Sequence, residues 1–170
     1  MTTSGEAMAF LNMARKYQKA GSRLLDSIEG DKADPQRALS DPLYFLFAHT
    51  LELAFKAFLL VRGEDIPISG KAGHDIVALH RQCAALGLGL KEDAESLPRV
   101  VEMLATENER HGFRYFDPVR GNNGIIAALP WTCEVVNALI EAIREQLGDT
   151  TPDSPVKVQF IVGKPTTRDS

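Results

Sequence analysis

The stretch that decides the fold runs from Pro42 to Val61 and reads PLYFLFAHTLELAFKAFLLV. Its apolar side chains recur at helical spacing and cover almost the whole circumference of a helix. A helix that is apolar on most sides is surrounded by other helices. The stretch therefore predicts a central buried helix, and with it an all-α fold.

The same stretch has about the 20 residues that a membrane span needs. However, His49, Glu52 and Lys56 lie in its interior. A charged side chain at the middle of a bilayer costs about 2.5–3.5 kcal/mol on insertion scales. We therefore expect the core helix of a soluble protein and no membrane association.

Helix signals on either side of this stretch predict its neighbours. Asp41 is expected to cap the central helix and Pro42 to take its first position, so that Glu29 to Ser40 form a loop. Helical periodicity predicts further helices at about 5–28, from His74–Asp75 to Gly87, from Ser96 onwards, and at about 132–147. We expect residues 1–150 to form a four-to-five-helix up-and-down bundle.

The segment 151–170 differs from the rest of the chain. Val156, Val158, Phe160 and Val162 alternate with other residues, which is the periodicity of a strand. No partner strand is evident upstream. We expect a short C-terminal tail that is extended or disordered, or that pairs across a dimer.

Composition limits the function classes. The 170 residues carry a formal net charge of −4 and have a sequence pI of about 5.6, which argues against a generic nucleic-acid-binding protein but leaves room for a small basic site. Cys83 and Cys133 are the only cysteines and show no zinc-ligand spacing, so no metal site and no cofactor are expected. Two buried thiols and the lack of a signal peptide at the N-terminus favour the reducing cytoplasm.

Three ionisable residues of the central helix form the first candidate site. His49, Glu52 and Lys56 are spaced by three and four residues, so they share one helix face. Two interpretations remain open. The three side chains line a ligand site, or they form a paired polar stripe that only satisfies its own members.

A helix start forms the second candidate. Lys71 and His74 precede the helix that begins near Asp75, and the free backbone donors of a helix N-terminus favour anions. These residues predict a phosphate site. The alternative is that Asp75 or a neighbour caps the helix and that His74 is an ordinary surface residue.

The third candidate lies in a long irregular segment, Asn108 to Pro130. Arg110, Arg114 and Tyr115 suit phosphate contacts and base stacking, and His111 exchanges protons near neutral pH. Arg110, His111 and Arg114 are therefore the catalytic candidates. The alternative is an ion-pair network that pins the segment through its acidic residues, Glu107, Glu109 and Asp117.

Several of these residues stand in an order that resembles a known family. His49 to Leu60 followed by Gly63 resembles the A/H-x-x-E-L-x-x-K-A-x-L…G helix of the HEPN family (higher eukaryote and prokaryote nucleotide-binding). Gly73-His74-Asp75-Ile76 and Leu79 are similar to the G-H-D-L-x-x-L opening of that family's next helix. Arg114-Tyr115 is similar to its R-Y pair. The resemblance covers about Leu43 to Pro118.

The resemblance implies a dimeric helical bundle that binds RNA or a nucleotide, with a role in toxin–antitoxin or defence systems. Many family members are metal-independent endoribonucleases with an R-x4–6-H motif, and this chain has no arginine followed by a histidine at that spacing. A divergent endoribonuclease and a non-catalytic partner of a nucleotidyltransferase are therefore kept as alternatives. We expect the heads of Glu52, Lys56, His74 and Arg114 to lie near one cleft.

Overall fold

The computed structural model describes residues 3–29, 35–66, 73–90, 94–109 and 129–148. Over these residues the chain forms five helices and no strand, which confirms the all-α fold. The helices are α1 (Thr3–Glu29), α2 (Pro35–Val61), α4 (Ile76–Ala85), α5 (Ser96–Glu109) and α6 (Leu129–Leu147). The expected tail, 151–170, lies outside the described residues.

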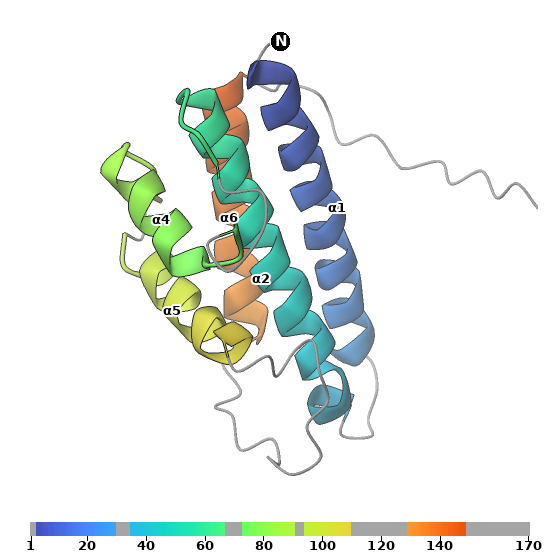
Figure 1. Ribbon diagram of the computed structural model, residues 1–170. Helices are drawn as coiled ribbons and strands as arrows, with labels where there is room; N and C mark the ends of the chain where they lie inside the picture. Colours follow the sequence, from blue (N-terminus) through green and yellow to red (C-terminus); the bar gives the residue numbers. More distant parts are fainter. Residues whose placement is uncertain (1–2, 30–34, 67–72, 91–93, 110–128, 149–170) are drawn as a thin grey trace, which may run out of the picture.

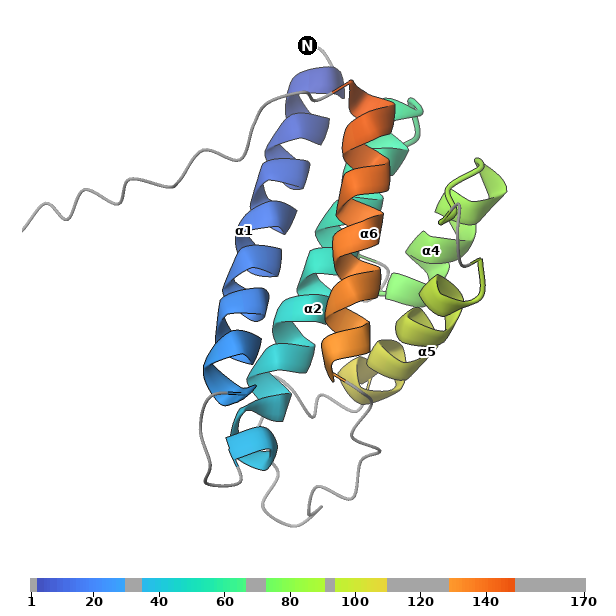
Figure 2. The same ribbon diagram turned by 180° about the vertical axis from the view of Figure 1, so that it is seen from behind.

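The helices are arranged around α2. Figures 1 and 2 show α1 on one flank of α2 and α6, and α4 with α5 on the other flank. Helix α1 runs antiparallel to both α2 and α6. Helix α2 packs against each of the other four helices, so the prediction of a central helix is confirmed.

Burial of α2 follows its apolar sequence. Leu43, Phe47, Leu51, Phe55 and Phe58 are fully buried. By length and composition alone, Pro42–Val61 could cross a membrane, but 78% of this segment is already covered by the protein itself. The core helix of a soluble protein shows the same pattern.

The start of α2 differs from the prediction. The helix begins at Pro35, so Asp41 is not its cap and Pro42 lies inside it. A proline within a helix removes one backbone hydrogen bond and favours a kink. Pro35 and Pro42 could each occupy the first turn of a helix. The helix starts at the earlier one, because the residues between them, Gln36 to Ser40, include good helix formers.

The other helix ends lie close to their predicted positions. Asp75 caps α4, since its carboxylate accepts a hydrogen bond from the backbone N–H of Ala78 at 2.9 Å. Gly87 and Gly148 follow α4 and α6 with positive φ angles of 87° and 66°, the left-handed conformation that glycine adopts without strain. Helix α6 begins at Leu129, three residues before the predicted Thr132.

Both cysteines are buried and free, as their apolar surroundings predicted. Desolvation raises the pKa of the Cys83 thiol to about 12, and its Sγ donates a weak hydrogen bond to the carbonyl of Phe55 at 3.6 Å. Cys83 is therefore a core residue that links α4 to α2.

Candidate functional site

A buried carboxylate lies at the centre of the candidate site. Glu52 stands midway along α2, and its side chain is only 4% exposed. The Nζ atom of Lys56, one turn later and equally buried, donates a hydrogen bond to Glu52 Oε1 at 2.8 Å. A buried charge without a partner would cost free energy of folding. The ion pair avoids this cost for both Glu52 and Lys56.

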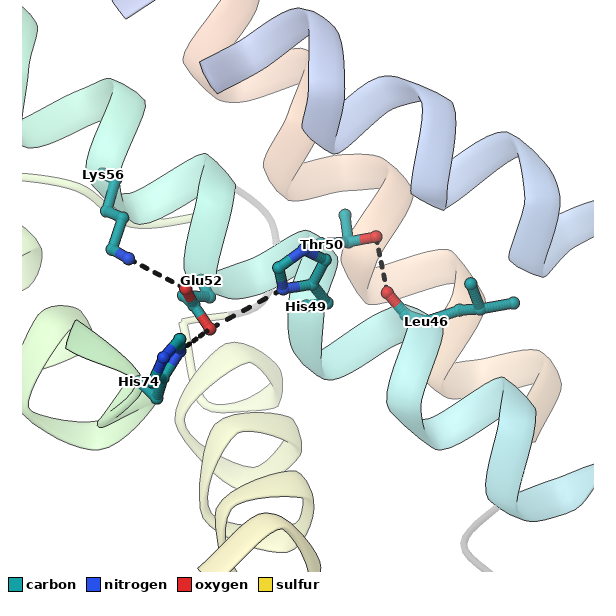
Figure 3. A network of polar contacts seen from close by, with 6 residues as sticks. All are labelled: Leu46, His49, Thr50, Glu52, Lys56 and His74. Atoms are coloured by element: carbon teal, nitrogen blue, oxygen red, sulfur yellow. Dashed lines mark hydrogen bonds and ion pairs between the residues drawn. The ribbon is translucent and has the colours of Figure 1, made fainter. Parts of the chain in front are cut away.

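The second oxygen of Glu52 contacts two histidines (Figure 3). His74, at the entry to α4, places its Nδ1 atom 3.1 Å from Glu52 Oε2. His49, one turn earlier in α2, has its Nδ1 atom 3.7 Å from the same oxygen. We call these four residues, His49, Glu52, Lys56 and His74, the Glu52 cluster.

Aromatic rings hold His49 in place. Tyr17 of α1 meets the imidazole edge to face, with centroids 4.6 Å apart, and Phe45 stacks on it at 5.9 Å. Among the described residues the buried Nδ1 atom of His49 has no hydrogen-bond partner. His49 therefore contributes mainly a packed ring beside Glu52.

Electrostatics keep Glu52 ionised. Desolvation by itself would raise the pKa of this carboxyl group, but the closeness of His49, the hydrogen bonds from Lys56 and His74 and the charge of Lys56 outweigh it and lower the pKa to about 2. A carboxylate with such a low pKa is a poor general base near neutral pH. The role that fits Glu52 is to orient its neighbours.

Of the four side chains, His74 is the most accessible to a ligand, with 42% of its side chain exposed. An ionised carboxylate only accepts hydrogen bonds, so the Nδ1 atom of His74 must carry the proton that it shares with Glu52. In the neutral ring Nε2 is then an acceptor, and in the protonated ring it is a donor. The Glu52 cluster thus presents one oriented imidazole edge.

The structure brings part of the predicted site together. Glu52, Lys56 and His74 meet as expected, although His74 is 22 residues from Glu52. The other predicted residues, Lys71, Arg110, His111, Arg114 and Tyr115, lie outside the described residues. The expected contact of Arg114 with this cleft therefore stays a prediction. The described part of the chain holds no group of three His, Cys, Asp or Glu residues suited to a metal ion.

A groove of about 770 Å³ lies elsewhere, between α6 and the described residues Gly89, Leu90 and Ser96. Trp131 and Leu90 supply apolar lining, while Glu134, Glu141 and Glu145 make it acidic. None of the predicted binding residues lines it. Helical periodicity predicted α6 but not this groove, because Glu134 and Glu141 are exposed and lie away from the buried side of the helix.

The chain matches no known family model, no curated protein and no solved structure.

Proposed function

We propose that this chain is a HEPN-like helical protein that binds RNA or a nucleotide, forms a homodimer and acts in a toxin–antitoxin or defence system. The observation that carries the proposal is the hydrogen bond between Glu52 and the half-exposed His74. It joins the middle of the most buried helix to a surface position.

The residues that meet in the Glu52 cluster support the family resemblance. His49, Glu52 and Lys56 come from the first of the three quoted motifs and His74 from the second. A polar stripe that only satisfied itself would need no residue from a second segment, because Lys56 already pairs with Glu52 within α2. The added contact to His74 fits a carboxylate that orients an imidazole toward a ligand.

The chemistry of the exposed imidazole edge of His74 suits a nucleotide. Glu52 and Lys56 cancel each other's charge, so the cluster gains a net positive charge when His74 is protonated and then attracts phosphate. When His74 is neutral, its Nε2 accepts a hydrogen bond from a base or a 2′-hydroxyl group. The N-terminus of helix α4 is already capped by the Asp75 carboxylate, so the imidazole of His74 itself would make the contact with the nucleotide.

Fluorescence anisotropy with the full chain tests the proposal. The probes are a labelled mixed-sequence RNA of about 12 nucleotides, within the range of single-strand-binding sites, and labelled ATP and GTP, all in EDTA. We expect the wild type to bind at least one probe and His74→Ala to weaken that binding by about tenfold or more, the size of one lost charged hydrogen bond. Arg81→Ala, an exposed change on the same helix, should have no effect.

Failure of the wild type to bind any of the three probes contradicts the proposal, as does an equal loss in the Arg81→Ala control. RNA cleavage in EDTA that His111→Ala abolishes would instead establish the endoribonuclease. Co-purification with a nucleotidyltransferase, without binding of RNA or nucleotide, would favour the role of a non-catalytic partner.

A further inference from the structure

The outer side of α1 carries a concentration of positive charge in an otherwise acidic chain. From Ala7 to Leu25 the sequence contains Arg15, Lys16, Lys19 and Arg23 and no carboxylate, whereas the whole chain has a net charge of −4. Lys16 and Arg23 are exposed, and Arg15 and Lys19 are partly exposed. The charge is thus at the surface.

Helical geometry arranges these cations in a row. Arg15, Lys19 and Arg23 follow one another at intervals of four residues, so they share one face and their backbone positions rise by about 6 Å per step. Regular spacing of this kind suits a polymer with regularly spaced negative charges, whereas a single small anion would need only one or two of the side chains.

Helix α6 adds a fifth cation. Gln18 donates a hydrogen bond to Asn137 at 2.6 Å, and Ser22 lies 3.3 Å from Cys133 through its hydroxyl group. These contacts set α1 and α6 side by side and antiparallel (Figure 2), and Arg144 of α6 is near enough to Lys19 for its charge to lower the pKa of Lys19. Arg144 is bonded to both carboxylate oxygens of Glu141. We call Arg15, Lys16, Lys19, Arg23 and Arg144 the basic ridge.

Lys19 lies close enough to three other cations of the ridge for their charges to act on it. The pKa of Lys19 is lowered, first by desolvation and then by the charges of Arg15, Arg23 and Arg144. A bound polyanion would relieve this repulsion and release counterions as it binds. The ridge therefore concentrates positively charged side chains of α1 and α6 on one surface.

We infer that the basic ridge binds the phosphate backbone of single-stranded RNA, an inference that rests on the proposed function and extends it. Helix α1 lies on the flank of α2 and α6 that faces away from α4 (Figures 1 and 2), so we expect a mononucleotide at His74 to leave the ridge unoccupied and a longer strand to contact it. Insertion into a membrane fits less well, because the apolar side of α1, including Leu11, Ala14 and Leu25, is already buried in the core.

A triple variant of the full chain, Arg15→Gln/Lys19→Gln/Arg23→Gln, tests the inference. We expect its affinity for the labelled RNA to fall by about tenfold or more, and the slope of log affinity against log salt to decrease by about 2, because each lost phosphate contact on a single strand contributes about 0.7. Affinity for the labelled mononucleotide should stay unchanged. Circular dichroism melting curves check that the variant folds.

A matched control changes the same net charge elsewhere. Arg62, Arg81 and Arg99 are exposed arginines outside the ridge, and their joint replacement by glutamine should leave RNA affinity within about twofold. An equal loss in this control would overturn the inference, because net charge alone would then explain it.

The two proposals fail in different ways. If the wild type binds mononucleotide but binds RNA no more tightly, the ridge is not an RNA site and the proposed function stands. If it binds neither, both are wrong. If the ridge variant retains RNA affinity but loses binding to vesicles rich in phosphatidylserine, the ridge is a membrane contact and the inference is overturned.

Discussion

Lys56 is the residue whose loss should cost the most stability in the Glu52 cluster. Its ammonium group is 2.8 Å from Glu52 Oε1, and both side chains are 4% exposed. Removing one partner of a buried pair leaves the other charge unpaired, which typically costs about 3–5 kcal/mol. We expect Lys56→Met to lower the free energy of unfolding by about that amount, as measured by urea denaturation.

Two comparisons make this prediction specific. The double variant Glu52→Leu/Lys56→Met removes both charges and should recover at least half of the loss, because apolar replacements of buried ion pairs are often tolerated. Arg99→Ala breaks the exposed pair with Glu95 and should cost less than about 1 kcal/mol. A cost of that small size for Lys56→Met would show that the pair is not buried.

The pH dependence of stability follows from the same carboxylate. The pKa of Glu52 is lowered to about 2 from an ordinary value of 4.5, so the unfolded state takes up a proton first as the pH falls. The ionised group therefore stabilises the fold above about pH 5, and this contribution, about 3 kcal/mol, is lost as the pH falls toward about 2.

Urea unfolding of wild type and Glu52→Gln at several pH values across this interval measures the effect. On acidification the free energy of unfolding of the wild type should fall by about 3 kcal/mol more than that of the variant. Parallel pH profiles of the two proteins would contradict the assignment of a low pKa to Glu52.

At the scale of the elements, the packing of α1 on α2 depends on a glycine. A Cβ atom added to Gly21 would lie 2.7 Å from Cε1 of Phe47, and the ring of Phe47 is fully buried. Gly21→Ala should therefore destabilise the protein by about 1–3 kcal/mol through overpacking, although alanine favours a helix by up to about 1 kcal/mol.

Gly5 in the same helix provides the matched control, because nothing lies within 4 Å of its added Cβ atom. Gly5→Ala should leave stability unchanged or raise it slightly. Thermal melts of both variants measure the effect on stability. A stabilised Gly21→Ala protein would show that α1 and α2 do not approach each other closely at Phe47.

A helix could be predicted from the sequence where its apolar pattern or its end residues gave an unambiguous local signal. The apolar circumference of Pro42–Val61 identified the central helix, and Asp75 and Gly87 marked both ends of α4. The start of α2 was missed because Pro35 and Pro42 give the same local signal. The need for glycine at position 21 follows from the close approach of Phe47, which only tertiary packing reveals.

At the scale of the whole molecule, spacing along one helix predicted that His49, Glu52 and Lys56 share a face. The contact of Glu52 with His74 needed the family resemblance, because the two residues are 22 positions apart and nothing local relates them. The acidic groove beside Trp131 was not predicted, since it depends on how α6 lies against Gly89, Leu90 and Ser96.

The central claim is that RNA or a nucleotide binds at the His74 edge of the Glu52 cluster. Histidine-selective NMR tests it directly, because the chain has four histidines, and His80, packed against Phe55 at 5.6 Å, serves as an internal reference. On titration with the oligonucleotide or nucleotide probes, we predict that the ring signals of His74 shift while those of His80 stay in place. An unmoved His74 signal at saturating probe would contradict the account.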